Sequence, residues 1–207
     1  MVKTNIAMQV LKKEINRKIL DATKKLVSQK GFRKTSMREI ANVSGVSLGN
    51  LYNYYASKDD ILKTIVKPVV DIMNNIMESV KTASLAENIS DEVGMQQLDL
   101  LCASVMKLRR MKQLVKILYY KSDGSEIANY QTDYKENAVK TVKTWRLHRN
   151  NLPKDMDDKV LDFIVQMHVN WMMTLLEGLI LQDFDEPQIR QLLREYISVD
   201  WMYVKKY

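Results

Sequence analysis

Residues 35–58, TSMREIANVSGVSLGNLYNYYASK, bring hydroxyl, amide and phenol groups together at short spacing. Serine, asparagine and tyrosine side chains form hydrogen bonds with phosphate oxygens and with base edges, and a lysine adds a positive charge for phosphate. Ser47 and Gly49 are small, so backbone N–H groups beside them can approach a phosphate closely. The chemistry that this segment indicates is therefore the recognition of double-stranded DNA.

Two short helices are needed to position these groups. Residues 36–39, SMRE, fit a capping box, which predicts a helix over residues 36–43. Ser47 is a favourable N-cap for a further helix that ends near residue 54. Gly45 lies between the two helices and is free to adopt a positive φ in a tight turn. This arrangement predicts a helix-turn-helix whose second helix enters a major groove about 12 Å wide.

The second helix supplies most of the expected contacts with DNA. Asn50 and Asn53 are placed to read base edges, Tyr52 and Tyr54 to reach bases or backbone, and Lys58 to bind phosphate. The candidate DNA contacts are Thr35, Ser36, Arg38, Ser47, Leu48, Gly49, Asn50, Tyr52, Asn53, Tyr54 and Lys58. The residues expected to pack inward are Val46, Leu51 and Tyr55, against Ile19, Leu26 and Ile40.

The positive charge is concentrated at one end of the chain. The 207 residues include 32 Lys and Arg and 25 Asp and Glu, for a net charge of +7. Residues 1–60 contain 12 of these basic and 5 of these acidic residues, so the whole excess lies there. This pattern is typical either of a polyanion-binding head on a neutral body or of a solvated basic face without a partner.

The remaining segments have the 3.6-residue period of helices. With 6 Gly and 3 Pro, the sequence lacks the turns of a strand-rich fold, and an all-α fold is predicted. Pro68 is expected to kink or end the helix that begins near residue 57. The other expected helices cover residues 12–29, 91–109, 112–121, 125–149, 157–182 and 187–204.

Several function classes lack their residues in this sequence. There is one cysteine, Cys102, and the two histidines, His148 and His168, have no neighbouring ligands at metal-site spacing. No phosphate loop or nucleophile motif is present, so we expect no enzyme activity, metal or cofactor. Neither a secretion signal nor a credible membrane span is found, which predicts a cytoplasmic protein.

Residues 15–63 resemble the TetR/AcrR family of bacterial transcriptional regulators. The family pattern is present in Gly31-Phe32, in Ile40-Ala41 and in residues 45–58, GVSLGNLYNYYASK. Leu48 departs from the basic or polar residue common in the family, and Tyr55 replaces the usual Phe. The hydroxyl of Tyr55 therefore needs a partner in the protein or a water molecule.

The resemblance implies a homodimer of about nine helices per subunit. Residues 1–56 would form the DNA-binding domain and residues 57–207 a regulatory domain that binds a small-molecule effector and dimerises. The effector of such a repressor releases it from its operator. Two rival functions stay open: a DNA-binding activator or architectural protein without a ligand, and a helical small-molecule carrier or enzyme with an incidental basic head.

The helix expected over residues 157–182 is apolar nearly all round, which predicts burial on several sides. Its sequence fits either the core of a monomer or a core that continues into a second subunit, as the resemblance implies. The candidate interface residues are Phe163, Leu175, Gly178, Leu179, Leu193, Tyr196, Ile197 and Trp201.

Methionine and aromatic side chains are frequent after residue 100, and they fit either an adaptable ligand cavity or ordinary core. Glu177 fits a cationic ligand or an ion pair with an arginine, and His168 fits a ligand contact or a satisfied core position. The candidate pocket residues are Met106, Tyr119, Tyr134, Trp145, Met167, His168, Trp171 and Glu177.

Overall fold

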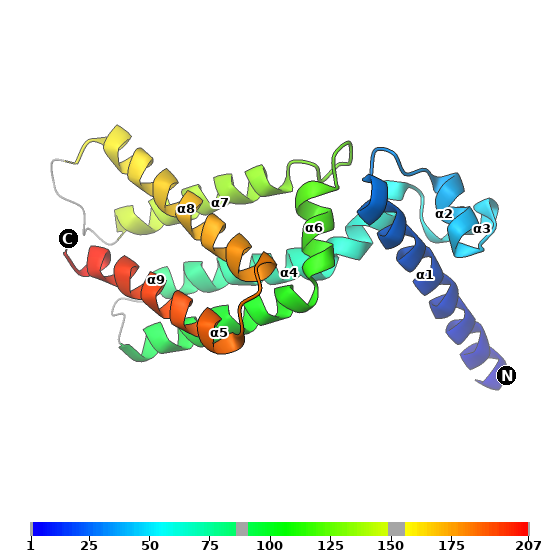
Figure 1. The fold of residues 1–207 in the computed structure, drawn as a ribbon, viewed down its shortest axis with the longest axis horizontal. Helices are drawn as coiled ribbons and strands as arrows, with labels where there is room; N and C mark the ends of the chain where they lie inside the picture. Colours follow the sequence, from blue (N-terminus) through cyan, green and yellow to red (C-terminus); the bar gives the residue numbers. More distant parts are fainter. Residues whose placement is uncertain (1, 86–90, 149–155, 207) are drawn as a thin grey trace. The chain divides into compact units, whose positions relative to one another are not determined.

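The computed structural model describes residues 2–85, 91–148 and 156–206, and within these ranges every regular element is an α-helix (Figure 1). In chain order the helices are α1 (Val2–Lys30), α2 (Met37–Ser44), α3 (Leu48–Tyr54), α4 (Lys58–Leu85), α5 (Asp91–Arg110), α6 (Lys112–Tyr120), α7 (Tyr130–His148), α8 (Asp158–Leu181) and α9 (Glu186–Lys206). The predicted all-α fold is confirmed.

Two helix starts differ from the sequence-based prediction. α1 begins at Val2 instead of near residue 12. α7 begins at Tyr130 instead of near residue 125, because the chain first makes successive tight turns. Gly124 has φ +81° in these turns, and the N–H of Ser125 donates to the carbonyl of Ser122 at 3.0 Å.

Pro68 does not end α4, which continues through it to Leu85. The missing N–H of a proline frees the carbonyl four residues earlier, here that of Thr64. Both Thr64 and Pro68 are exposed, so water can bind the freed carbonyl and the helix tolerates the interruption.

The chain divides into two compact units, and the first takes its residues from two stretches, Met1–Val69 and Gln113–Tyr130. The predicted domain boundary after residue 56 lies inside this unit. Side chains from α1 to α4 and from α6 form its buried interior: Ile19, Phe32, Ile40, Leu51, Ile61, Leu62, Val115, Ile117 and Leu118.

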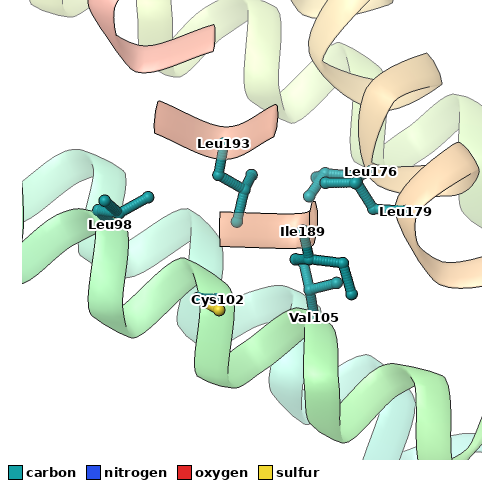
Figure 2. Packing of buried hydrophobic residues seen from close by; sticks show 7 residues of the cluster. All are labelled: Leu98, Cys102, Val105, Leu176, Leu179, Ile189 and Leu193. Carbon is teal, nitrogen blue, oxygen red and sulfur yellow. The ribbon is translucent and has the colours of Figure 1, made fainter. Parts of the chain in front are cut away.

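The second unit comprises Val70–Lys112 and Gln131–Tyr207. Figure 2 shows a cluster in it, to which α5, α8 and α9 contribute Leu98, Cys102, Val105, Leu176, Leu179, Ile189 and Leu193. Burial raises the pKa of the Cys102 thiol, which is a small apolar member of this core. At the C-terminal end of α8, Arg109 of α5 donates to the carbonyls of Leu179 and Gln182, each at 2.6 Å.

α8 is the one described helix whose length and mean hydropathy, 1.3, match those of a membrane span. A core helix of a soluble protein meets the same criteria. Seven residues of α8 are buried in this structure, among them Leu161, Val169 and Leu176. Burial in the core accounts for only part of the apolar composition of α8, and one such helix is weak evidence for a membrane span.

Candidate nucleic-acid interface

α2 and the turn after it follow the predicted motif closely. The N–H of Glu39 is bonded to the hydroxyl of Ser36 at 3.2 Å, and the Glu39 carboxylate accepts the N–H of Ser36 at 3.0 Å. These two bonds form the predicted capping box. Gly45 then ends α2 with φ 68°, a left-handed conformation that glycine adopts without steric cost.

Glu39 also forms an ion pair with Lys30, the last residue of α1. The hydrogen bond from Lys30, and after it those from Ser36, lower the pKa of the Glu39 carboxyl. One carboxylate thus joins the end of α1 to the start of α2.

α3 is held in the first unit by its apolar side. Leu51 is fully buried and Val46, before the helix, is 8% exposed, as the sequence predicted. Tyr55, the C-cap of α3, donates its hydroxyl to Oδ1 of Asn16 on α1 at 2.6 Å. Asn16 is the partner that this departure from the family pattern required, and burial raises the pKa of Tyr55.

The opposite side of α3 faces solvent. Ser47 caps the helix by accepting the N–H of Asn50 at 3.3 Å. Gly49 is exposed, and a Cβ added to it would meet nothing within 4 Å. Tyr52 is 52% exposed and Asn53 is also exposed. This face therefore presents a helix N-terminus, an amide and a phenol to a large ligand.

The other predicted contacts vary in accessibility. Leu48, Asn50 and Tyr54 are half-buried, whereas Ser36 and Arg38 are exposed. Thr35 differs from the prediction, because its side chain is 3% exposed and its hydroxyl donates to the carbonyl of Gly31 at 2.9 Å. Thr35 closes the loop between α1 and α2 and presents no free hydroxyl to DNA.

Lys58, which the sequence predicts to bind phosphate, has partners within the chain in this structure. Its ammonium donates to the carbonyls of Phe32 at 3.1 Å and Thr35 at 3.0 Å. It also lies 4.1 Å from the centre of the Phe32 ring, within range of a cation–π interaction. In this structure Lys58 therefore joins the start of α4 to the loop before α2.

Residues 121–126, which we call the strap, contact the same loop. The carbonyl of Lys121 accepts the N–H of Phe32 at 2.8 Å, and Arg33 is paired with Asp123 at 3.0 Å. Lys63 on α4 is paired with Glu126 at 2.5 Å, and this hydrogen bond raises the pKa of Lys63. Sequence reasoning missed the strap, because these contacts join residues more than 60 positions apart.

The described pocket candidates lie in different surroundings. Tyr119 belongs to the first unit, whereas Met106 packs beside the core cluster of the second. Tyr134 is buried, and its hydroxyl donates to the carbonyl of Met73 at 2.8 Å. Glu177 is half-buried. That these residues line one ligand pocket stays a prediction.

Three further pocket candidates, Met167, His168 and Trp171, belong to α8. Met167 is 56% and Trp171 is 48% exposed. His168 Nε2 lies 3.3 Å from the hydroxyl of Tyr196, whose ring is 4.8 Å from that of Trp171. Met167 and Trp171 therefore face outward in this chain. The side chain of Trp145 lies outside the described residues.

The interface candidates divide into a core group and an outer group. Leu179 and Leu193 are almost fully buried within this chain's own core, so they are not free to contact a second subunit. Tyr196 is 9% exposed, whereas Phe163 is 65% exposed. Leu175 and Gly178 are half-buried, and the side chains of Ile197 and Trp201 lie outside the described residues. Among the residues that are described, no group of three metal-ligating side chains occurs.

The family model described as "Bacterial regulatory proteins, tetR family" matches residues 19–65. The chain is 37% identical over 70 residues to the HTH-type transcriptional regulator HbdR of Aromatoleum sp. (strain CIB), covering 34% of this chain and 31% of HbdR. It is 32% identical over 53 residues to the HTH-type transcriptional repressor KstR2 of Rhodococcus jostii (strain RHA1), covering 26% of each. The chain thus matches about a third or less of the length of these curated relatives.

Similarity of fold extends over nearly the whole chain. NalD, described as the secondary repressor of the MexAB-OprM multidrug efflux pump in Pseudomonas aeruginosa, has a TM-score of 0.57 at 17% identity, covering 90% of this chain and 96% of NalD. A TetR-like transcriptional regulator from Rhodococcus sp. RHA1 has a TM-score of 0.58 at 16% identity, covering 91% and 96%.

Proposed function

We propose that this chain, which belongs to the TetR family of bacterial regulatory proteins, is a cytoplasmic transcriptional regulator that binds an operator through α3. The observation that carries the proposal is the exposed face of α3. There the capped N-terminus, the open position of Gly49 and the half-exposed ring of Tyr52 lie together on a unit with excess positive charge. A helix terminus binds phosphate, and the neighbouring side chains reach base edges.

Selection of duplexes from a randomised pool tests this proposal directly. A regulator enriches one sequence, and its affinity for that duplex falls with salt by a log–log slope of about −0.9 per phosphate neutralised. A carrier or enzyme with an incidental basic head enriches no sequence, and that result would refute the proposal.

Two exposed tyrosines provide a matched pair of variants. Tyr52 on α3 is 52% exposed and Tyr120 on α6 is 51% exposed. Tyr52→Ala should weaken binding to the selected duplex about 5- to 150-fold, since a contact with a base edge contributes about 1–3 kcal/mol. Tyr120→Ala should bind like the parent. Equal affinities for the two variants, at unchanged melting temperature, would exclude the assigned contact.

We also propose that the chain acts as a homodimer. Val160, Phe163, Met167 and Trp171 follow one another at helical spacing along α8, and each is 48–65% exposed. A contiguous apolar stripe on a helix marks an interaction surface. A second copy of this stripe is a matching partner, and two heads would read half-sites about 34 Å apart.

Sedimentation of charged variants tests the dimer. Met167→Glu should give a monomer, because the stripe would then bury an unpaired carboxylate. Leu100→Glu on α5, at a residue that is likewise 54% exposed and apolar, should leave the dimer intact. A dimeric Met167→Glu variant would place the interface elsewhere.

We propose lastly that the chain is a repressor and that a small-molecule effector releases it from its operator. An effector shifts the balance between DNA-binding and released states only by its differential affinity for the two. A compound library screened for raised melting temperature, and then for release of the selected duplex, tests this. If every compound that stabilises the protein leaves DNA binding unchanged, the ligand-independent activator or architectural function is favoured instead.

A further inference from the structure

The N-terminal turns of α1 extend beyond the part of the chain that matches the family. That match begins at residue 19, which is also the first fully buried position among the side chains of α1 that the structure describes. Residues 9–14 are all exposed, although they are helical. Figure 1 shows α1 continuing toward the N-terminus past α2 and α3. Residues 9–14 therefore contribute nothing to the described core of the first unit.

The extension begins beside the end of α3. Asn16 accepts the hydroxyl of Tyr55, which directly follows α3. Lys12 lies four residues before Asn16 and therefore on the same face of α1, about 6 Å further along the axis. Lys12 therefore lies one helical turn beyond the residue of α1 that contacts the end of α3.

The charges on this extension suit a polyanion. Lys12, Lys13 and Arg17 are exposed. Glu14 is the one acid among residues 9–18, and it is paired with Lys18 at 3.0 Å. The positive charges of the other three residues therefore remain available to phosphates.

We propose that Lys12, Lys13 and Arg17 form a second DNA contact, which binds phosphates beside the groove that α3 occupies. This inference rests on the proposed function. The contact adds affinity without changing which sequence is preferred, because phosphates are the same at every base pair. It makes binding by this chain more dependent on salt than α3 alone would make it.

A triple variant and a matched control test the proposal. The test variant is Lys12→Gln, Lys13→Gln and Arg17→Gln in the full-length chain. The control changes the same residue types on the second unit, Lys107→Gln, Lys140→Gln and Arg110→Gln, which are also exposed. Glutamine has nearly the helix propensity of lysine and arginine, so both variants should keep their helices.

Affinity for the selected duplex is measured from 50 to 200 mM salt, together with hydroxyl-radical footprints. Loss of three phosphate contacts reduces the log–log slope by about 2.7, so the parent should lose about 40-fold more affinity than the test variant over this range. The footprint should lose one group of protected positions per half-site, and the preferred sequence should be unchanged.

The failures of the two proposals are distinguishable. If the parent selects no sequence, the proposed function fails. If the parent binds its selected duplex and the test variant has the same slope and footprint, the second contact is refuted and the proposed function stands. Equal reductions of slope in test and control variants would also refute it, because they would show an effect of total charge.

Discussion

Gly49→Ala should affect folding and DNA binding in opposite directions. Gly49 is the second residue of α3, its φ lies outside the left-handed region, and an added Cβ would meet nothing within 4 Å. Alanine is favoured over glycine inside a helix by up to about 1 kcal/mol. The free energy of unfolding should therefore rise, and the melting temperature with it, by up to about 2–4 °C for a chain of this size.

Bound DNA changes the environment of the added methyl group. If backbone N–H groups at the start of α3 contact a phosphate, this methyl group holds that phosphate away. Loss of one hydrogen bond to a charged group costs about 1.5–3 kcal/mol. This corresponds to about 10- to 150-fold weaker binding.

Thermal unfolding and fluorescence anisotropy with the selected duplex, at one salt concentration, measure the two effects. Asn74→Ala on the exposed side of α4 is the control, since it also favours helix but lies outside the first unit. It should raise the melting temperature without weakening DNA binding. A Gly49→Ala variant that binds DNA as tightly as the parent would refute the close approach of α3 to phosphate.

Three further changes test the contacts that stabilise the first unit. Lys58→Met removes two hydrogen bonds to main-chain carbonyls, so it should lower the melting temperature and leave the salt slope unchanged; a slope reduced by about 0.9 would show a phosphate contact instead. Tyr55→Phe should cost about 0.5–1.5 kcal/mol of unfolding free energy in denaturant titrations, because Asn16 loses its donor; no change would mean that water replaces it. The pKa of the Glu39 carboxyl lies below its ordinary 4.5 in the folded chain. The contribution of this carboxylate to the free energy of unfolding is therefore complete above pH 4.5 and is lost as the pH falls through the lower folded pKa. Denaturation midpoints between pH 7 and pH 2 should show this loss, and Glu39→Gln should remove it.

The features of the first unit that sequence alone predicted are those that depend on residues close together in the chain. The capping box of Ser36 and Glu39, the cap at Ser47 and the positive φ of Gly45 each depend on residues within a few positions. The two carbonyl partners of Lys58 were not predicted, because they lie 23 and 26 residues away and are brought to it by the fold. A lysine at a helix start looks the same in sequence whether it faces a phosphate or a carbonyl.

The second unit shows a different limit of sequence patterns. α8 is apolar nearly all round, so its periodicity does not tell which side faces solvent. The structure buries Leu179 with α5 and α9 and leaves Phe163 65% exposed. Packing against α5, which is distant in sequence, and against α9, which follows α8, decides which apolar side chains remain available to a partner.

The discontinuous make-up of the first unit constrains how such a head can be exchanged between proteins. Cutting the gene after residue 56 would separate Phe32 from the carbonyl of Lys121 and Arg33 from Asp123. A chimera built by joining one continuous N-terminal piece to a foreign body would therefore lack part of its own support. Recombination that preserves DNA binding must transfer the strap of residues 121–126 together with the N-terminal residues, unless the recipient protein supplies equivalent contacts.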